Sequence, residues 1–410
     1  MATRGFYGWR MVYGCMAIAT VSWSLCLFGT SVYLHALHEK TGLSIALVSS
    51  GISAAYVLAA VSQLWVGNAI ARLGPRVVIT GGAAAMAIGV AGVGIVQELW
   101  QVFATFLVLG AGWACLSTAA LTTTLAPWFE QHQGKAASTA LLGASLGGML
   151  GVPLLLSGIT HIGLTATTTI AAVLAFIIVV LIAMLVLRHR PQDMGLVPDG
   201  IPHTTDDRTG TPRQWTRIGA LRTLALRTVM IGFGVGLMVQ LGFLTHHVNL
   251  LLPVLGAPAA AATVTATAVA AFIGRMLLAG WSDRVDVRVT TFALLLVGAA
   301  SLSLMAVFPS AWVLVSVSII YGLTVGNVTT LGPIIVRREF GSLSFGLVYG
   351  TAATGIQLLS ALGPTLYGVL FDHFGSYSAP LLLAAGLQIL AATTILRGGR
   401  RGASDLNAAH

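Results

Sequence analysis

One arginine, Arg275, lies in the middle of an apolar segment, TATAVAAFIGRMLLAGW, that covers residues 265–281. An arginine at the centre of a helix in a lipid bilayer costs roughly 2.5–3.5 kcal/mol, and its guanidinium group keeps its proton in proteins. A planar guanidinium binds a carboxylate through two parallel hydrogen bonds. We therefore interpret Arg275 as the receptor for an anionic group inside a membrane-spanning helix.

The charge of Arg275 could also be accommodated in two different ways. Arg275 precedes Trp281 by six residues, about 9 Å along a helix, so its side chain could extend to the membrane surface. A carboxylate of the protein could also neutralise it. However, all twelve acidic residues fall in loops or at the ends of the predicted spans, so the sequence offers no such partner near mid-membrane.

Two adjacent histidines, His246 and His247, are the second group that could do chemistry, in the apolar stretch FLTHHVNLLLP (residues 243–253). Neighbouring residues of a helix point about 100° apart, so the pair cannot hold one metal ion together. Histidine titrates near neutral pH, so either residue could carry a coupled proton; a hydrogen-bonded structural histidine is the alternative. The sequence shows no nucleophile–base set, metal-ligand cluster or cofactor motif, and we predict no catalytic residue, metal or cofactor.

The composition requires that membrane-spanning helices position these residues. Of the 410 residues, 56% are hydrophobic and 8% are charged, whereas a soluble domain carries about 25% charged residues. One span needs about 20 apolar residues, and long continuous apolar runs favour helices. The sequence predicts an all-α membrane protein with twelve transmembrane helices, at residues 11–34, 44–66, 77–96, 101–126, 137–159, 164–187, 228–252, 258–281, 289–308, 311–335, 344–370 and 378–396.

The basic residues predict the orientation of these spans, since cytoplasmic loops are enriched in lysine and arginine. With both termini in the cytoplasm, nineteen of the 21 basic residues lie on the cytoplasmic side, Lys40 lies outside and Arg275 lies within a span. This distribution also accounts for the net charge of +9, so nucleic acid is not implied as a partner. We expect a multi-pass protein of the bacterial inner membrane, in contact with the lipid bilayer.

A polar stretch at residues 188–227 divides six predicted spans from six. Its proline, glycine, aspartate and arginine content is typical of a solvated linker. The sequence therefore predicts an N-terminal six-helix half (1–187), a cytoplasmic linker and a C-terminal six-helix half (228–410) with a short cytoplasmic tail.

The two halves repeat each other. Arg72 and Arg76 recur as Arg284 and Arg288 at an offset of 212 residues. A repeat of six-helix halves is a signature of secondary transporters, which hold the substrate near the membrane midplane between the repeats.

Three glycines in GASLGGMLG, Gly143, Gly147 and Gly151, are spaced four apart and share one helix face. Small residues at this spacing let two helix backbones approach closely. We predict ordinary close packing of two helices there, with a moving seam as the alternative.

The loop GNAIARLGPR (residues 67–76) resembles the signature of the major facilitator superfamily between spans 2 and 3. That signature has a glycine, an acid–arginine pair and then Gly-x-Arg; Gly67, Arg72 and Arg76 match it, whereas Ala71 replaces the acid. The resemblance implies the major facilitator fold, with two pseudo-symmetric halves, and a gating role for this loop.

The second half keeps the acid–arginine pair in GWSDR, as Asp283 and Arg284. Within the superfamily the chain is similar to the monocarboxylate-transporter and oxalate–formate-antiporter branch. This likeness is carried by FYGWRMV (6–12), WFEQHQGKA (128–136), RPQDMGLVPDG (190–200), FGSLSFG (340–346) and the single Arg275.

Further polar or aromatic residues near mid-span could complete a pocket for the anion. A single one is more often a contact between helices than a ligand. The resemblance implies substrate contacts on span 10 and favours Tyr321 and Asn327. The other candidates are Ser24, Gln63, Trp113, Ser117, Ser145, Gln240 and Gln357.

These observations predict a secondary active transporter of a small organic anion, a monocarboxylate moved in symport with a proton by alternating access. An organic anion exchanger without proton coupling is the alternative within transport. A membrane receptor or enzyme built on the same fold is the alternative from another class. We expect a monomer.

Overall fold

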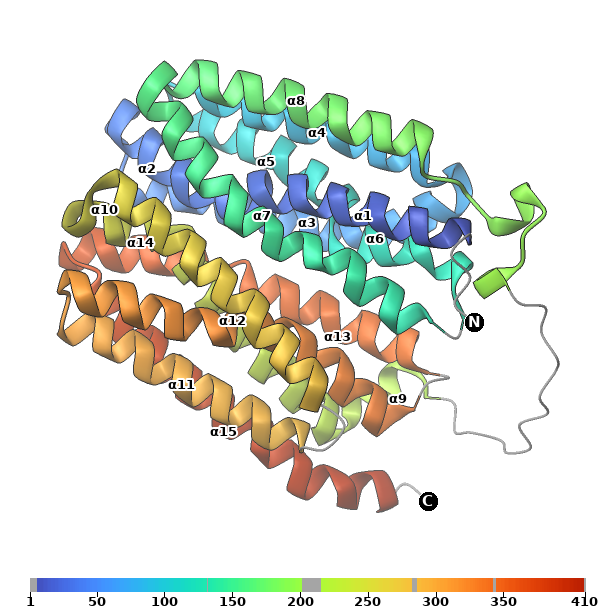
Figure 1. The fold of residues 1–410 in the computed structure, drawn as a ribbon. Coiled ribbons are helices and arrows are strands. Elements are labelled where there is room, and N and C mark those ends of the chain that lie inside the picture. The colour runs from blue at the N-terminus through green and yellow to red at the C-terminus, as the bar shows by residue number, and fades with distance from the viewer. Residues whose placement is uncertain (1–5, 131, 201–214, 282–285, 342–343, 409–410) are drawn as a thin grey trace. The chain divides into compact units, whose positions relative to one another are not determined.

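A computed structural model of the chain describes residues 6–130, 132–200, 215–281, 286–341 and 344–408 (Figure 1). These residues form helices and contain no strand, as predicted. The helices are α1 (Tyr7–Trp23), α2 (Gly29–Thr41), α3 (Ile45–Leu73), α4 (Pro75–Ile95), α5 (Leu99–Leu116), α6 (Thr118–Leu125), α7 (Gln133–Ile162), α8 (Leu164–Leu185), α9 (Arg217–Arg222), α10 (Leu224–Trp281), α11 (Val287–Val307), α12 (Ala311–Phe340), α13 (Phe345–Ser360), α14 (Gly363–Phe374) and α15 (Ser378–Ala408).

Eleven helical segments of the described chain are long and apolar enough to cross a membrane. One of them, Leu224–Leu278, has 55 residues, far more than one crossing needs. Gly256 divides it, because its φ of 73° and ψ of 168° lie outside the helical region and only glycine adopts them readily. If the helices before and after Gly256 are counted as separate spans, the total is the twelve that were predicted. Gly256 lies between the predicted seventh and eighth spans.

Three of the predicted spans are interrupted, which the sequence did not indicate. The first contains a π-helical turn at Ser24–Phe28 between α1 and α2. The fourth breaks at Ser117, whose backbone is extended between α5 and α6. The eleventh is divided between α13 and α14, just before Gly363.

The chain separates into two compact units. Unit 1 contains Met1–Leu43 and Ala54–Arg208, and unit 2 contains Ser44–Ser53 and Thr209–His410. Each unit is described separately below. The units divide inside the predicted linker, and the first residues of α3 belong to unit 2. The domain limits at 187/188 and 227/228 therefore stay a prediction.

In unit 1, α7 packs closely against α1 through the three predicted glycines. A Cβ atom on Gly147 would lie 2.7 Å from the Thr20 carbonyl oxygen, and one on Gly151 would lie 2.8 Å from the Ser24 Cα. Gly143 meets the carbonyl oxygen one turn earlier on α1 in the same way. The spacing of four therefore marks a helix–helix contact that no larger residue could make.

The internal repeat extends to individual contacts. A Cβ on Gly110 in α5 would overlap the Ala55 carbonyl oxygen of α3, and a Cβ on Gly322 in α12 would overlap the Thr267 carbonyl oxygen of α10. Both members of the second pair follow those of the first by 212 residues. The units thus use the same backbone contact between their second and fourth spans.

The repeated arginines also make equivalent bonds. Arg76 Nε donates to the Leu187 carbonyl oxygen at 2.8 Å, and Arg288 Nη1 donates to the Ile395 carbonyl oxygen at 2.6 Å. Each arginine begins the third span of its unit, and each carbonyl lies at the end of the sixth. Leu187 lies just after the end of α8, where carbonyls lack helical partners and cationic donors are favourable. Ile395, in contrast, lies inside α15, which continues to Ala408.

The start of the predicted linker folds onto unit 1. Asp199 is buried, and its carboxylate accepts the Glu130 backbone N–H at 2.8 Å and contacts His132 Nδ1 at 3.1 Å. Its φ of 57° is the only positive value at a non-glycine residue of the described chain. Near the end of the predicted linker the chain forms the short helix α9; residues 201–214 lie outside the described part.

Candidate functional site

Arg275 lies on the second part of α10, partly buried against α12. Its Nε donates to the Gly326 carbonyl oxygen at 3.2 Å. This bond requires that the two helices nearly touch. They do so because Gly322 and Gly326 on α12 meet the carbonyl oxygens of Thr267 and Ala271 on α10 with no side chain between them.

The Gly326 carbonyl is a shared acceptor. Besides the hydrogen bond from Arg275 Nε, it accepts hydrogen bonds from the hydroxyl groups of Thr329 and Thr330, each at 3.0 Å. The bond from Nε holds one edge of the Arg275 guanidinium against α12. Bidentate recognition of a carboxylate would use two parallel N–H donors of this planar group.

Asn327, predicted as a substrate contact, follows Gly326 directly and is 4% exposed. Its Nδ2 donates to the Leu323 carbonyl oxygen at 2.9 Å, while its Oδ1 is buried without a hydrogen-bond partner among the described residues. A buried amide oxygen normally has a partner. The structure therefore places an unsatisfied acceptor one residue from the carbonyl that holds Arg275.

The carboxylates of the described residues lie at helix ends and in loops, as the sequence indicated. Glu98 and Asp286 are at helix N-termini, whereas Glu339 and Asp372 are in last turns. The side chains of Asp206, Asp207, Asp283 and Asp405 lie outside the described part.

Tyr321 is fully buried inside unit 2, and its hydroxyl oxygen lies 3.5 Å from Gln388 Nε2 of α15. Its ring packs at 4.6 Å on Phe243, which packs at the same distance on His247. Two predicted residues, one for substrate and one for the proton, thus belong to one aromatic cluster. The hydroxyl group of Tyr321, which we predicted as a substrate contact, accepts the bond from α15.

The two histidines have different surroundings, although both are buried. His246 uses both ring nitrogens, Nε2 at 2.9 Å from the Pro364 carbonyl oxygen and Nδ1 at 3.1 Å from the Tyr377 hydroxyl oxygen. His247 has Nε2 at 3.1 Å from the Ser318 hydroxyl oxygen, and its Nδ1 has no hydrogen-bond partner among the described residues. Of the two histidines, His247 is the one with a buried ring nitrogen that makes no hydrogen bond to a described residue.

Three further residues predicted for the pocket belong to different units. In unit 1, Trp113 of α5 packs edge-on against Trp23 at 4.5 Å, next to the π-helical turn, and Ser145 of α7 is buried. In unit 2, Gln357 lies on α13, partly buried. Whether any of these three approaches the anion stays a prediction.

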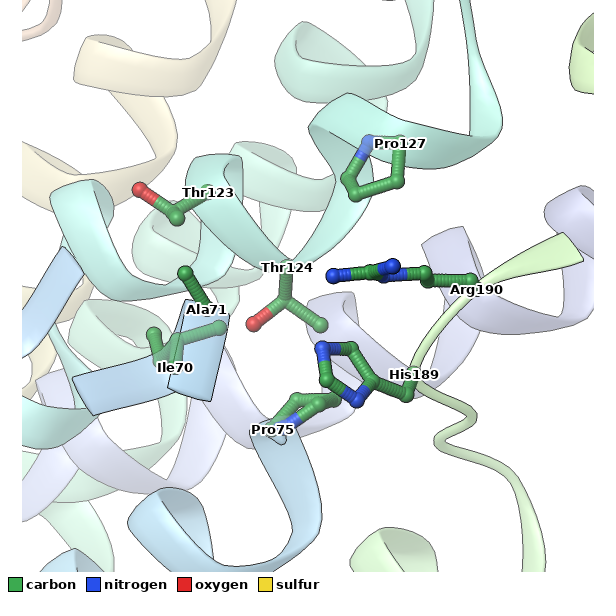
Figure 2. Close-up of a pocket in the computed structure, with 8 residues that line it drawn as sticks. All are labelled: Ile70, Ala71, Pro75, Thr123, Thr124, Pro127, His189 and Arg190. Carbon is green, nitrogen blue, oxygen red and sulfur yellow. The ribbon is translucent and has the colours of Figure 1, made fainter. Parts of the chain in front are cut away.

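The predicted signature loop joins α3 and α4 in unit 1. Most of this stretch is helical, which corrects the prediction of a loop: residues 67–73 end α3, and only Gly74 separates α3 from α4. Gly67 has open surroundings, Arg72 is exposed, and Arg76 binds the Leu187 carbonyl after α8. Ala71 lines an open pocket at this end of the unit (Figure 2). Asp283 and Arg284, the corresponding pair of the second half, lie outside the described residues.

A buried ion pair in unit 2 was not predicted. Arg288 is 6% exposed and binds Glu339 through two parallel hydrogen bonds, Nε–Oε1 at 2.7 Å and Nη2–Oε2 at 2.8 Å. The pair connects α11 to α12, and the same guanidinium reaches carbonyls of α10 and α15. The offset of 212 marked Arg288 as a repeat of Arg76, but no pattern pointed to Glu339 as its partner.

Comparison with known proteins agrees with this architecture. The family model of the Major Facilitator Superfamily matches residues 12–285, more than half of the chain. A bacterial homolog of the human lysosomal transporter Spinster, in an inward-facing and occupied conformation, superposes with a TM-score of 0.73 and 14% identity, covering 97% of both chains. The nucleoside transporter NupG superposes with a TM-score of 0.71 and 13% identity, covering 95% of this chain and 99% of its own.

One curated relative is similar in part. The oxalate:formate antiporter of Oxalobacter formigenes is 25% identical over 183 residues, and the match covers 44% of each protein. The chain therefore matches less than half the length of this relative. The chain is a multi-pass membrane protein with twelve spans in two repeated halves, and its fold is one of transporters and not of enzymes. The family model and the signature residues agree: the chain belongs to the Major Facilitator Superfamily.

Proposed function

We propose that the chain transports a small organic anion by alternating access and that Arg275 receives its carboxylate. The observation that carries this proposal is the bond from Arg275 Nε to the Gly326 carbonyl, inside a helix pair packed too closely for any intervening side chain. A permanent charge in that place is costly, and recognition of a planar anion accounts for its retention.

The neighbouring Asn327 supports a polar site of limited size. Its Oδ1, which has no partner among the described residues, can accept a hydrogen bond from a hydroxyl or protonated carboxyl group of a substrate. One fixed guanidinium in apolar surroundings favours a monocarboxylate over a dicarboxylate. Gln357, Trp113 and Ser145 stay proposed contacts, and we propose Tyr321 as a packing neighbour of the site because its hydroxyl group faces Gln388.

Proton symport is the transport mode that we propose first, with His247 as the proton carrier. Of the two adjacent histidines, it has the ring nitrogen without a partner among the described residues, whereas His246 uses both nitrogens for contacts that fix it structurally. Ser318, on the other ring nitrogen of His247, could orient the ring.

Anion exchange is the second candidate. It is favoured by the partial likeness to an oxalate:formate antiporter and by the placement of the described carboxylates outside mid-membrane. Exchange needs no protonatable side chain, since each half-cycle is completed by a loaded carrier.

The test of the binding proposal compares Arg275→Lys and Arg275→Gln with wild type in a thermal-shift screen of oxalate, formate and larger aliphatic and aromatic monocarboxylates. Lysine keeps the charge but not the planar fork, and glutamine loses both. A charge-assisted hydrogen bond contributes about 1.5–3 kcal/mol, so affinity should fall more than tenfold in both variants, further in glutamine.

Arg227→Gln is the matched control, because Arg227 lies on the same helix and its Nε also donates to a backbone carbonyl, at 2.8 Å, but its side chain is exposed. Its ligand-induced shifts should equal those of wild type. An Arg275→Gln protein that melts at lower temperature yet binds carboxylates like wild type would identify Arg275 as a structural residue.

The transport mode is decided by His247→Ala in proteoliposomes. Under symport, this variant should lose accumulation driven by a pH gradient and keep counterflow, which moves no net proton. Accumulation equal to wild type would remove His247 from the mechanism, and a wild-type protein indifferent to the pH gradient would establish exchange.

We further propose a monomer in the bacterial inner membrane with both termini in the cytoplasm. The distribution of basic residues supports this orientation. A reporter enzyme active only outside the cytoplasm, fused after residue 410, should be inactive; strong activity would reverse the topology.

A further inference from the structure

A small open pocket at one end of unit 1 is not used by the proposed function. Its volume is about 120 Å³. It lies where α3 ends and α4 begins, against α6 and the segment that follows α8 (Figure 2). The lining residues are Ile70, Ala71, Pro75, Thr123, Thr124, Pro127, His189 and Arg190.

Two basic side chains project into this pocket. Figure 2 shows the Arg190 guanidinium and the His189 ring directed toward Thr124, which is buried at the pocket's floor. The Arg190 backbone is held by its N–H bond to Asp193 Oδ2 at 3.1 Å. None of the eight lining residues is acidic, so no carboxylate of the lining pairs with the exposed Arg190 side chain.

The backbone adds to the positive potential. Helix α4 begins at Pro75, and its N-cap residue Gly74, with φ 83°, supplies no side-chain cap. The first N–H groups of a helix carry a partial positive charge and bind anions when no side chain caps them. A Cβ on Gly74 would lie 3.4 Å from His189 Nδ1, so the imidazole stands directly beside this uncapped helix end.

Ala71 accounts for the open space. At this position the superfamily's signature has an acid, whose carboxylate would occupy the space and neutralise the bases. Alanine leaves the space open. Next to it, Leu73 and Val77 are 62% and 58% exposed, as expected for residues at a lipid boundary.

From this arrangement we infer that the pocket binds a phosphoryl group. The exposed Arg190 guanidinium and the half-buried His189 ring approach the same space beside the N-terminus of α4, and two basic groups around one open space suit a group with several equivalent oxygens. The phosphoryl group belongs either to the headgroup of an anionic lipid or to a free phosphate.

The test uses the full-length protein, with Arg190→Gln and Ala71→Asp as pocket variants and Arg188→Gln as the matched control. Arg188 is two residues away, but its Nη1 donates to the Met184 and Leu187 carbonyl oxygens and it does not line the pocket. His189→Gln is a second pocket variant in case one of the others folds poorly.

Two arms distinguish the sources. In detergent, sodium phosphate is titrated against sodium chloride at equal ionic strength, and the melting temperature is measured. In nanodiscs, phosphatidylcholine alone is compared with phosphatidylcholine containing phosphatidylglycerol, and retained phosphatidylglycerol is counted by native mass spectrometry. Saturable stabilisation by phosphate identifies a free-phosphate site, and retention of phosphatidylglycerol identifies a headgroup site; either supports the inference.

The expected effect is a loss of affinity of about tenfold or more in Arg190→Gln and Ala71→Asp, with Arg188→Gln equal to wild type. Three results would overturn the inference: no response of wild type in either arm, equal responses of Arg190→Gln and Arg188→Gln, or undiminished binding in Ala71→Asp.

Discussion

The buried pair Arg288–Glu339 gives a prediction with a defined magnitude. Glu339→Gln would leave the Arg288 guanidinium, which is 7% exposed, without this counter-charge. Removing one partner of a buried ion pair costs roughly 3–5 kcal/mol. Because the Glu339 side chain is 22% exposed and Arg288 keeps two carbonyl acceptors, we expect about 3 kcal/mol, at the lower end of that range.

The reciprocal change has more consequences. Arg288→Met would leave the Glu339 carboxylate without its partner and would also remove the donor to the Ile395 carbonyl oxygen. It should therefore cost more than Glu339→Gln. In the double variant Arg288→Met with Glu339→Leu neither charge of the pair stays buried, and its cost should be smaller than the sum of the single costs by at least about 2 kcal/mol.

The measurement is the free energy of unfolding in mixed detergent micelles for wild type, both single variants and the double variant. Arg337→Gln is the control, since Arg337 lies on the same turn of α12 but is exposed, and such a change is expected to fall within about 0.5 kcal/mol of wild type. Additive costs, or a Glu339→Gln protein as stable as wild type, would show that the pair does not join the helices energetically.

Three further predictions concern packing and the linker. Gly322→Ala should destabilise unit 2 by more than about 1 kcal/mol, because its Cβ would overlap the Thr267 carbonyl, whereas Gly386→Ala, in open surroundings on α15, should be neutral or stabilising in the same unfolding assay. Asp199→Ala should accelerate hydrogen exchange at the Glu130 amide, which loses its acceptor; unchanged exchange would contradict the contact. His246→Phe keeps a ring against Tyr367 but removes the hydrogen bonds of His246 to the Pro364 carbonyl and the Tyr377 hydroxyl group, so the melting temperature should fall by the equivalent of about 1–3 kcal/mol, and an unaltered value would count against a structural role.

Much of the fold followed from apolar runs and basic residues, because lipid allows few alternatives to spanning helices. The twelve spans and the close packing of Gly143, Gly147 and Gly151 are of this kind. The interruptions of the spans were harder to predict, because hydropathy carries no information about backbone angles. Ser117, for example, interrupts its span although neither neighbour is a proline or glycine.

The candidate site was predictable only in part. Arg275 stood out because a charge is rare in an apolar run, but its acceptor, the Gly326 carbonyl, is backbone and has no sequence signal. Likewise, the contrast between His246 and His247 depends on Pro364, Tyr377 and Ser318, which are far away in the chain. Contacts of this kind are set by packing between helices rather than by neighbouring residues.

The glycine contacts between α10 and α12 have a mechanical consequence. Where two backbones touch without side chains, there are no rotamers that could rearrange, so the pair has one low-energy register. We expect Arg275, Gly326 and Asn327 to keep their mutual distances through every stage of a transport cycle. An anion held there would be carried on a stiff element whose intrinsic affinity does not change, and any switch between tight and weak binding would have to arise from groups outside this helix pair.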